Sequence, residues 1–307
     1  MAAIKVAVHG LGNIGRHAVD CLQTALDMEC LGIIRRAPSL GKNPLDLRGC
    51  PDFASIDDLV AKQGKPDVVC VCSPSRNVPE DASFYLGKGF CTVDSFDIHS
   101  EIGKLVPRLD EAAKKNGVAA ITAAGWDPGT DSMFRALLEA MAPAGTTFTN
   151  FGRGRSMGHS VAVRSMKGVA DATSITIPIG GGRHARLVYV LPEKGASFEE
   201  IKKTIAADPY FVHDPLEVRE VADSGEMALV ADNSHGLLME RIGASGSTGN
   251  QRFSIDMRID NPALTAQILV SSARAATRMP AGCYTLIDIP PVALLPGERM
   301  KHIARLV

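Results

Sequence analysis

Short apolar runs alternate with helical patterns along the first 122 residues of the chain. The apolar runs, each typical of a buried strand, cover residues 6–8, 31–34, 68–72, 91–93 and 119–122. Between them, apolar residues recur with the spacing of an amphipathic helix, for example over residues 56–62 and 105–115. Strands that alternate with helices in this way predict an α/β fold with a doubly wound parallel sheet.

The pattern changes beyond residue 145, where apolar residues recur at every second position in longer runs. These runs are FTNFG, TSITIPI, ARLVYVL, LLMERIG and QRFSIDMRI, and glycine-rich turns such as GRGRSMG and GGGRH separate them. They predict a mostly antiparallel sheet, with one helix around residues 198–206. Residues 263–278 follow Asp260-Asn261-Pro262 and predict an amphipathic helix with a capping residue and a proline at its start.

A glycine motif directly follows the first predicted strand, in the sequence IKVAVHGLGNIGR. In this pattern Gly10 permits a tight turn, Gly12 lets the backbone approach a pyrophosphate, and Gly15 lets the next helix pack closely on the sheet. The N–H groups at the start of that helix, at Asn13 and Ile14, then face the phosphates. The spacing predicts a Rossmann-type dinucleotide-binding domain.

Two arginines stand where an acidic residue would select NAD. The second predicted strand ends in Arg35 and Arg36 instead of an aspartate or glutamate. A guanidinium group matches a 2′-phosphate as a bidentate donor, so the sequence predicts NADP(H) as the cofactor. For either arginine considered alone, the alternative to phosphate binding is that it is simply a solvent-exposed residue at the end of the strand.

Together these patterns predict two domains. We expect a dinucleotide-binding domain in residues 1–123, to which the C-terminal segment 262–307 returns. Residues 124–261 then form an α+β substrate-binding domain with a mostly antiparallel sheet.

The residues that follow the predicted parallel strands are candidates for chemistry, because ligands of such sheets bind beyond the carboxyl ends of the strands. Ser73-Pro74-Ser75 is one such segment, and Asp94 and Asp127 follow two later strands. The two aspartates could converge on a cationic group such as a substrate ammonium. Asp127 before Pro128 and Gly129 is equally an ordinary turn and helix-capping sequence.

Polar residues within the strands of the second half are a further candidate group. They are Thr176, Arg186 and His235, with Asn261 at the start of a helix. Polar side chains that converge from several strands could bind a carboxylate. Taken singly, each is more often a structural residue whose partners lie within the fold.

Composition and charge favour a small metabolite as the partner. The 307 residues include 33 basic and 34 acidic ones, without a basic cluster interleaved with aromatic residues that would indicate nucleic-acid binding. No apolar stretch approaches the roughly 18 residues of a membrane helix, and the first strand begins directly after the N-terminus, so we expect a cytoplasmic protein. The seven cysteines form no CxxC pair and the eight histidines lack metal-ligand spacing, so we expect reduced thiols and no metal.

Several longer segments resemble one enzyme family over essentially the whole chain. They are DSFDIH, AGWDPGTDS, NFGRGRSMGHSVAV and NPALTAQILVSSARAA, together with VAVHGLGNIGR and IIRR. In these segments the chain is similar to the meso-diaminopimelate D-dehydrogenases, NADP-dependent bacterial enzymes of lysine biosynthesis. AGWDPG followed about thirty residues later by SMGHS is the most specific part of the likeness.

The resemblance implies a reaction and a role for each candidate residue. The reaction is oxidative deamination of meso-2,6-diaminopimelate at its D-centre, giving L-2-amino-6-oxopimelate and ammonia, and the reverse reductive amination. By this resemblance Asp94 and Asp127 would hold the ammonium of the D-centre, and Trp126 and Phe151 would shape the pocket. The backbone at Met157 and Gly158 would bind the carboxylate beside that centre.

The resemblance also implies roles at the distal L-centre and at the cofactor. Thr176 and Arg186 would meet the distal carboxylate, and His235 and Asn261 would complete the polar contacts. The residues implied for NADP(H) are Gly10, Gly12, Asn13, Ile14, Gly15, Arg35, Arg36, Ser73, Pro74 and Ser75. The second domain would also carry the surface of a homodimer.

The resemblance leaves several alternatives open. His159 lies in the same loop as Met157 and has either a proton-transfer or a structural role, and Arg183 could assist or replace Arg186. The segment SITIPIGGGRHARLVYV resembles the broader-specificity branch of the family, so an NADP-dependent D-amino acid dehydrogenase is the first alternative. A non-catalytic NADP-binding sensor is the second, although a sensor need not retain Asp94, Asp127, Arg186 and Asn261.

Overall fold

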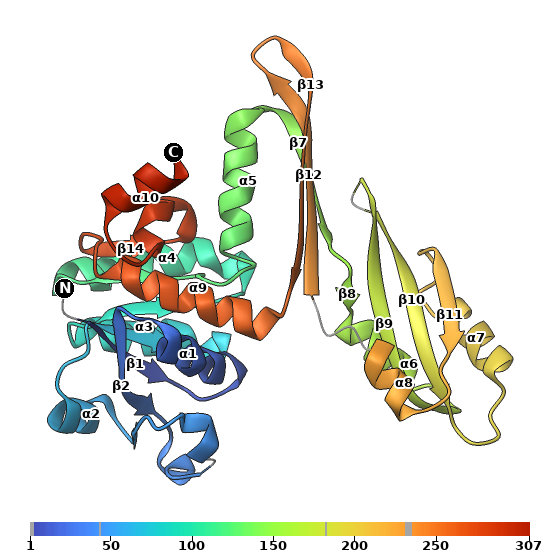
Figure 1. Cartoon of the computed structure of the whole chain (residues 1–307), viewed down its shortest axis with the longest axis horizontal. Helices are drawn as coiled ribbons and strands as arrows, with labels where there is room; N and C mark the ends of the chain where they lie inside the picture. The colour runs from blue at the N-terminus through green and yellow to red at the C-terminus, as the bar shows by residue number, and fades with distance from the viewer. Residues whose placement is uncertain (1–2, 43, 182, 231–234) are drawn as a thin grey trace. The chain divides into compact units, whose positions relative to one another are not determined.

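The computed structural model describes residues 3–42, 44–181, 183–230 and 235–307 (Figure 1). The chain forms two compact units, Met1–Ala136 with Pro262–Val307, and Leu137–Asn261. The first boundary lies after Ala136 and not after residue 123, because Ala124 and Met133 pack in the core of the first unit. Among the described residues, no helix is long and apolar enough to cross a membrane.

A seven-stranded parallel sheet forms the centre of the first unit, in the order β14-β6-β5-β4-β1-β2-β3. Its strands are β1 (Ile4–His9), β2 (Met28–Ile34), β3 (Asp52–Phe53), β4 (Val68–Val71), β5 (Cys91–Asp94), β6 (Ala119–Ile121) and β14 (Gly282–Tyr284). The doubly wound parallel sheet is therefore confirmed. The sequence pattern did not indicate β3 or β14, since these strands have only two and three residues.

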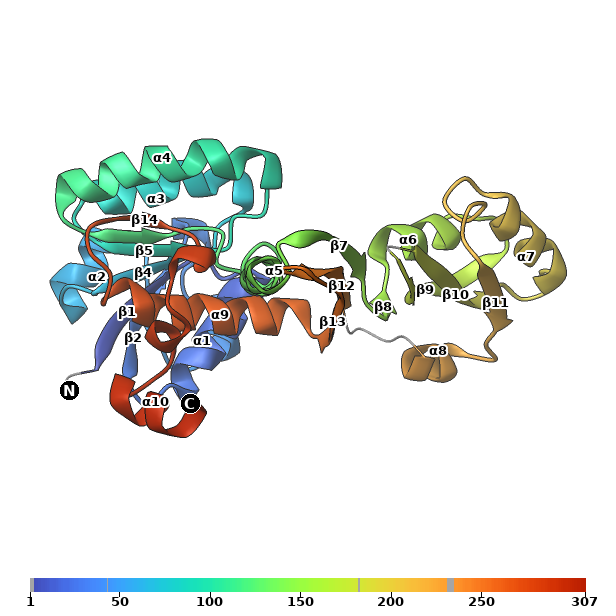
Figure 2. The ribbon, with the colours of Figure 1, turned by 90° about the horizontal axis from the view of Figure 1, so that it is seen from above.

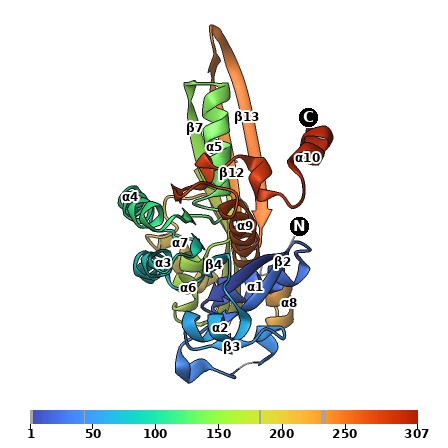
Figure 3. The same cartoon turned by 90° about the vertical axis from the view of Figure 1, so that its left-hand side faces the viewer.

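Helices cover both faces of this sheet (Figure 2 and Figure 3). The helices of the first unit are α1 (Asn13–Thr24), α2 (Ile56–Gln63), α3 (Val78–Gly87), α4 (His99–Asn116), α9 (Asn261–Ala276) and α10 (Arg299–Leu306), with α5 (Thr130–Met141) crossing the boundary. Short 3₁₀ helices lie at η1 (Ala37–Ser39), η2 (Pro44–Leu47), η3 (Ser75–Asn77), η4 (Leu286–Asp288) and η5 (Pro291–Leu294). One apolar core joins the sheet to α1 and α9, and a second joins it to α2, α3 and α4.

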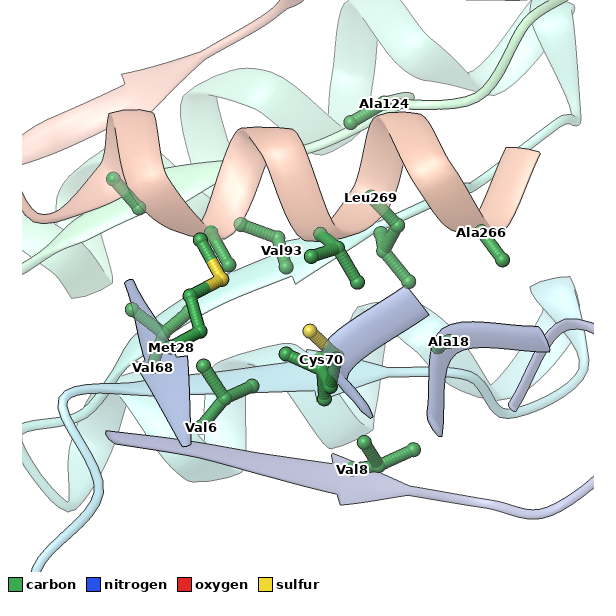
Figure 4. Packing of buried hydrophobic residues seen from close by; sticks show 14 of the residues in the cluster. Val6, Val8, Ala18, Met28, Val68, Cys70, Val93, Ala124, Ala266 and Leu269 are labelled. Atoms are coloured by element: carbon green, nitrogen blue, oxygen red, sulfur yellow. The ribbon is translucent and has the colours of Figure 1, made fainter. Parts of the chain in front are cut away.

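The returning helix α9 is part of the first core. Figure 4 shows Ala266 and Leu269 of α9 above strand residues that include Val68 and Cys70. Arg274 of the same helix donates to both carboxylate oxygens of Asp27, at 2.6 and 2.7 Å. The C-terminal segment thus completes the dinucleotide-binding unit, since its strand β14 also pairs with β6.

The second unit contains two sheets where the sequence predicted one. A four-stranded sheet has the order β11-β10-β9-β8 and a three-stranded sheet the order β13-β12-β7. The strands are β7 (Ala144–Phe151), β8 (Gly154–Arg155), β9 (Val169–Gly180), β10 (Arg183–Pro192), β11 (Leu216–Glu220), β12 (His235–Ser245) and β13 (Thr248–Ile259). All described pairs are antiparallel except β10 and β11, which are parallel.

The second unit also has more helices than the sequence pattern indicated. α7 (Phe198–Ala207) was predicted, whereas α6 (Met157–Arg164) and α8 (Ser224–Val230) were not. Both are short, and α6 begins inside the glycine-rich segment GRGRSMG that reads as a turn. Val163 of α6 and Ile205 of α7 are fully buried in the core of the four-stranded sheet. Tertiary packing therefore stabilises a helix that the local sequence only weakly favours.

Candidate active site

A cavity of about 570 Å³ lies in the first unit beyond the carboxyl ends of β1, β2 and β4. Its lining residues come from the glycine turn, the two arginines and the segment after β4: His9, Gly10, Leu11, Gly12, Ile34, Arg35, Arg36, Ser39, Cys72, Ser73, Pro74, Asn77 and Asp81. The structure thus brings together three segments that the sequence assigned separately to a dinucleotide.

The three glycines of the motif differ in what surrounds them. Gly10 has a φ of +94° and its missing Cβ would lie 2.8 Å from the carbonyl oxygen of Cys72. A Cβ at Gly15 would collide with the carbonyl oxygen of Gly10, whereas a Cβ at Gly12 would meet nothing within 4 Å. Gly12 is also the N-cap of α1, which has no side-chain cap and no acidic residue in its first turn. Open space before the uncapped N–H groups of Asn13 and Ile14 fits an anionic pyrophosphate.

The two arginines at the end of β2 have different surroundings. The Arg35 side chain is 9% exposed, and its Nη1 donates to Asp52 Oδ2 at 3.1 Å and to the Lys42 carbonyl at 3.0 Å. Asp52 Oδ2 also accepts from Gly41 N at 2.9 Å. Arg36 is the N-cap residue of η1. Its side chain is exposed, and it lines the cavity described above. Arg36 is therefore available to an anion, and Arg35 holds the segment between β2 and β3.

Two further features of the cavity concern the residues after β4 and a histidine that the sequence did not single out. Ser73 Oγ is buried without a hydrogen-bond partner among the described residues, while Ser75 lies in η3 and does not line the cavity.

His9 Nδ1 lies 4.0 Å from Asp81 Oδ2. Burial lowers the pKa of His9 and the Asp81 charge opposes this shift. Sequence reasoning did not single out His9, which directly precedes Gly10 of the glycine motif, or Asp81, which belongs to no motif.

Asp94 is a fully buried carboxylate at the end of β5. Its Oδ1 accepts three hydrogen bonds, from Thr122 Oγ1 at 2.8 Å, Phe96 N at 3.0 Å and Ala123 N at 3.2 Å. Its Oδ2 is buried without a partner among the described residues. Burial raises the pKa of Asp94 to about 6, against the opposing effect of these hydrogen bonds. One oxygen is thus fixed in place, and the other has hydrogen-bonding capacity that no described residue uses.

Asp127 lies in the turn after β6, which is anchored beside Asp94. Ala124 N donates to the Asp94 carbonyl at 2.8 Å, and the preceding residue in the turn, Trp126, is 4% exposed. Asp127 Oδ1 lies 3.7 Å from His99 Nε2. Burial and the neighbouring Asp131 charge raise the pKa of Asp127. The two predicted aspartates therefore follow neighbouring strands, and both are perturbed by burial.

A second polar cluster lies in the four-stranded sheet of the second unit. Arg186 on β10 is paired in register with Thr176 on β9, and its Nη1 donates to Thr176 Oγ1 at 2.6 Å. Its Nε donates to Asp214 Oδ2 at 2.9 Å, and its Nη2 lies 2.6 Å from His184 Nε2. Arg186 is 8% exposed, so this guanidinium group is buried and held on three sides. The sequence predicted Thr176 and Arg186, but not Asp214 and His184.

The remaining candidates are placed less completely. The structure describes the secondary structure of four of them but not their side chains: Phe151, Met157, Gly158 and His235. Asn261 is the first residue of α9. Arg183 is exposed, whereas Arg186 is buried.

His159 has both ring nitrogens within hydrogen-bond distance of the protein. Its Nδ1 lies 2.8 Å from Ser156 Oγ and its Nε2 lies 3.1 Å from the Tyr210 carbonyl. Burial and the nearby Arg186 charge lower its pKa. These contacts support the structural role for His159.

Metal ligation has no candidate in the described part of the chain. No group of three or more His, Cys, Asp or Glu side chains there could hold a metal ion. All seven cysteines are free thiols.

Two models of protein families match parts of the chain. The family described as oxidoreductase family, NAD-binding Rossmann fold, matches residues 4–91. The family described as diaminopimelic acid dehydrogenase C-terminal domain matches residues 125–182, which include Asp127 and Thr176.

Full-length similarity extends to named enzymes and to solved structures. The meso-diaminopimelate D-dehydrogenase of Bacteroides fragilis is 46% identical over 307 residues, covering 100% of each chain. The diaminopimelate dehydrogenase of Corynebacterium glutamicum, solved in complex with diaminopimelate, is 30% identical with a TM-score of 0.74 and 100% coverage of both chains. An engineered D-amino acid dehydrogenase bound to NADP⁺ is 28% identical with a TM-score of 0.70, again with 100% coverage of both chains. The chain therefore belongs to the meso-diaminopimelate D-dehydrogenase family.

Proposed function

We propose that this protein catalyses the NADP-dependent oxidative deamination of meso-2,6-diaminopimelate at its D-centre. The products are L-2-amino-6-oxopimelate and ammonia, and reductive amination is the reverse reaction. The observation that carries the proposal is the buried Arg186–Thr176 pair, a ready carboxylate site in a chain with 46% identity to a named enzyme of this activity.

NADP(H) is the cofactor in this proposal, and when bound it supplies the nicotinamide that exchanges a hydride with the substrate. Gly10, Gly12 and Gly15 with the start of α1 hold the pyrophosphate. Arg36 binds the 2′-phosphate and Arg35 positions the segment beside it. The open space at Gly12 and the unpartnered Ser73 hydroxyl in the same cavity support this assignment.

Asp94 and Asp127 bind the ammonium group of the D-centre in this proposal. Two carboxylates stabilise the cation and fix the position of the reacting carbon, a contribution of electrostatics and orientation. The amine must lose a proton before the hydride leaves, and Asp94 is the acceptor that we propose. Its free Oδ2 and its pKa of about 6 suit proton transfer near neutral pH. Water then attacks the resulting imine carbon, and ammonia leaves.

Arg186 and Thr176 bind the carboxylate of the distal L-centre. An arginine buried beside a hydroxyl donor gives such a carboxylate both binding energy and a fixed orientation. Trp126, Phe151, Met157, Gly158, His235 and Asn261 complete the substrate site in this proposal, as the family resemblance implies.

A homodimer in the cytoplasm is the further part of the proposal. On β13 the alternate residues Phe253, Ile255 and Met257 are apolar and only partly buried. An incompletely covered apolar sheet face supports an interface between two copies of the chain. Seven free thiols support a reducing compartment.

Comparing two substrates tests the proposed function against the broader D-amino acid dehydrogenase. Wild-type enzyme should reduce NADP⁺ with meso-diaminopimelate at a much higher kcat/KM than with D-alanine, which lacks the distal carboxylate. Arg186→Met should cut kcat/KM for meso-diaminopimelate by about a hundredfold, from the charged hydrogen bond and lost positioning. It should change the D-alanine value much less. Equal losses on both substrates would mean that Arg186 supports the fold instead, and Arg183 would be the next residue to test.

A further inference from the structure

The carboxylate site around Arg186 contains an acidic side chain that the proposed reaction does not use. Asp214 Oδ2 accepts from Arg186 Nε at 2.9 Å and lies 2.9 Å from His184 Nε2. Contact with Arg186 and His184 lowers the pKa of Asp214, although burial opposes this shift. Arg186 therefore has a resident counter-ion before any ligand arrives.

The cluster still has unused hydrogen-bonding capacity on both of its charged groups. A guanidinium group has five N–H donors, and each of the three nitrogens of Arg186 has one partner among the described residues. Two N–H groups thus remain for an incoming carboxylate. Asp214 Oδ1 takes part in none of the described contacts, and the Asp214 side chain is 20% exposed. An incoming cationic group can therefore reach Asp214.

The charges of the cluster favour one kind of ligand. Arg186 and Asp214 together carry no net charge, so a lone carboxylate gains less here than beside an unpaired arginine. A ligand that presents a carboxylate and an ammonium on the same carbon meets a complementary partner for each charge. The L-centre of meso-diaminopimelate is such a group, since it is an α-amino acid in its zwitterionic form.

We propose that Asp214 binds the ammonium group of the distal L-centre and is a specificity-determining residue of this enzyme. The proposal rests on the proposed function and assigns the distal subsite to a whole L-α-amino acid group rather than to a carboxylate alone. Inverting the distal centre moves the ammonium away from Asp214, and removing the amino group leaves Asp214 without a ligand. The subsite thereby selects both the presence and the configuration of the distal amino group.

Three substrates that share the reacting D-centre test this assignment. They are meso-diaminopimelate, DD-diaminopimelate and D-2-aminopimelate, of which the last two lack a correctly placed distal ammonium. The wild type should favour meso-diaminopimelate over both by at least about tenfold in kcat/KM, the scale of one charged hydrogen bond. Asp214→Asn should lower kcat/KM for meso-diaminopimelate by about tenfold or more, mainly through KM. For DD-diaminopimelate and D-2-aminopimelate, kcat/KM of this variant should stay within about threefold of the wild-type value.

Asp171→Asn is the matched control, because Asp171 pairs with Arg164 at 2.7 Å in the same unit outside this cluster. Asp171→Asn should leave kcat/KM for all three substrates unchanged. Equal losses on all three substrates in Asp214→Asn would overturn the proposal and leave Asp214 as a positioning residue for Arg186. A gain on meso-diaminopimelate would also overturn it, because Asp214 would then compete with the substrate carboxylate.

A binding measurement on the wild type tests the proposal without any variant. Calorimetric titration of the NADPH-saturated enzyme, which cannot oxidise substrate, should give a Kd for meso-diaminopimelate at least about tenfold below that for D-2-aminopimelate. Equal Kd values would contradict the role of Asp214. Absence of NADPH formation from meso-diaminopimelate and NADP⁺ would instead contradict the proposed function, whatever the ratio of Kd values.

Discussion

At the scale of single residues, the surroundings of a side chain decide its role more than its type does. Arg35 and Arg36 are adjacent and chemically identical, yet one is paired with Asp52 and the other is exposed at the cavity. The sequence predicts that both arginines meet a 2′-phosphate, because it shows the motif and not the partner 17 positions further on. The same holds for Asp214 and Arg186, which lie 28 positions apart.

Arg36→Ala should weaken NADP⁺ binding by about tenfold or more, since a charged hydrogen bond contributes roughly 1.5–3 kcal/mol. The KM for NAD⁺ and the Tm should barely change, because NAD⁺ lacks the 2′-phosphate and Arg36 is exposed. Arg35→Ala is the matched control and should lower the Tm, since Asp52 then loses its ion pair with Arg35 and keeps only the hydrogen bond from Gly41 N. Steady-state kinetics with both cofactors would refute the assignment if Arg36→Ala retained the full preference for NADP⁺.

Asp94 should give the enzyme an acid limb in its pH profile. Its pKa of about 6 means that the carboxylate is charged above this pH and neutral below it. The neutral form cannot hold the substrate ammonium or accept its proton, so kcat/KM for meso-diaminopimelate should fall as the pH drops through about 6. Asp94→Asn should be much less active and should lack this limb. A wild-type profile that stays flat between pH 5 and 7 would contradict the role of Asp94.

The same shift predicts how Asp94 affects stability. Burial raises its pKa from 3.8 to about 6, so the charged form is disfavoured in the folded state. No penalty exists below the unfolded pKa, where both states are protonated, and the penalty is complete above the folded pKa. At two pKa units it amounts to about 3 kcal/mol. Asp94→Asn should therefore raise the Tm at pH 8 relative to the wild type, and this gain should shrink towards pH 4.

Asp127→Asn should separate substrate binding from folding. The amide keeps the shape of the turn but removes the charge that we propose binds the substrate ammonium, so kcat/KM should fall strongly at a nearly unchanged Tm. Asp131 is the matched control, since it is fully buried and pairs with Arg135 at 2.7 Å. Asp131→Asn should mainly lower the Tm. If Asp127→Asn instead lost stability and kept its activity per folded molecule, the turn would have only a structural role.

At the scale of elements, regular periodicity was the reliable signal in this sequence. The helical spacing of residues 263–278 predicted α9, and the apolar run at residues 6–8 predicted β1. Helix α6 and strand β8 were missed, because they are short and lie in a glycine-rich segment. The parallel pairing of β10 and β11 was missed because contacts between distant segments decide strand order.

Helix α1 offers a test of the glycine turn with two matched substitutions. Gly15→Ala should lower both the Tm and the affinity for NADP⁺, because its Cβ collides with the Gly10 carbonyl and α1 must move. Such overpacking typically costs about 1–3 kcal/mol. Gly12→Ala should leave the Tm unchanged, since its Cβ meets open space. It should weaken NADP⁺ binding, because the new methyl group lies where we propose that the pyrophosphate approaches the backbone. Unchanged NADP⁺ binding in Gly12→Ala would place the pyrophosphate elsewhere.

At the scale of the whole molecule, each unit carries one part of the proposed chemistry. The first unit contains the cavity at the glycine motif and, outside its lining, Asp94 and Asp127. The second unit contains the Arg186 cluster. The sequence placed its candidate residues in these two parts because the glycine motif and the alternating strands occupy different parts of the chain. It did not predict that the second unit consists of two sheets.

Isotope transfer tests whether the hydride that reduces NADP⁺ comes from the D-centre of the substrate. The enzyme is given meso-diaminopimelate deuterated at the α-carbon of either the D-centre or the L-centre, and the NADPH formed is analysed by mass spectrometry. We predict deuterium in NADPH from the D-labelled substrate alone, with a slower reaction if hydride transfer limits the rate. Deuterium from the L-labelled substrate, or from neither, would contradict the account.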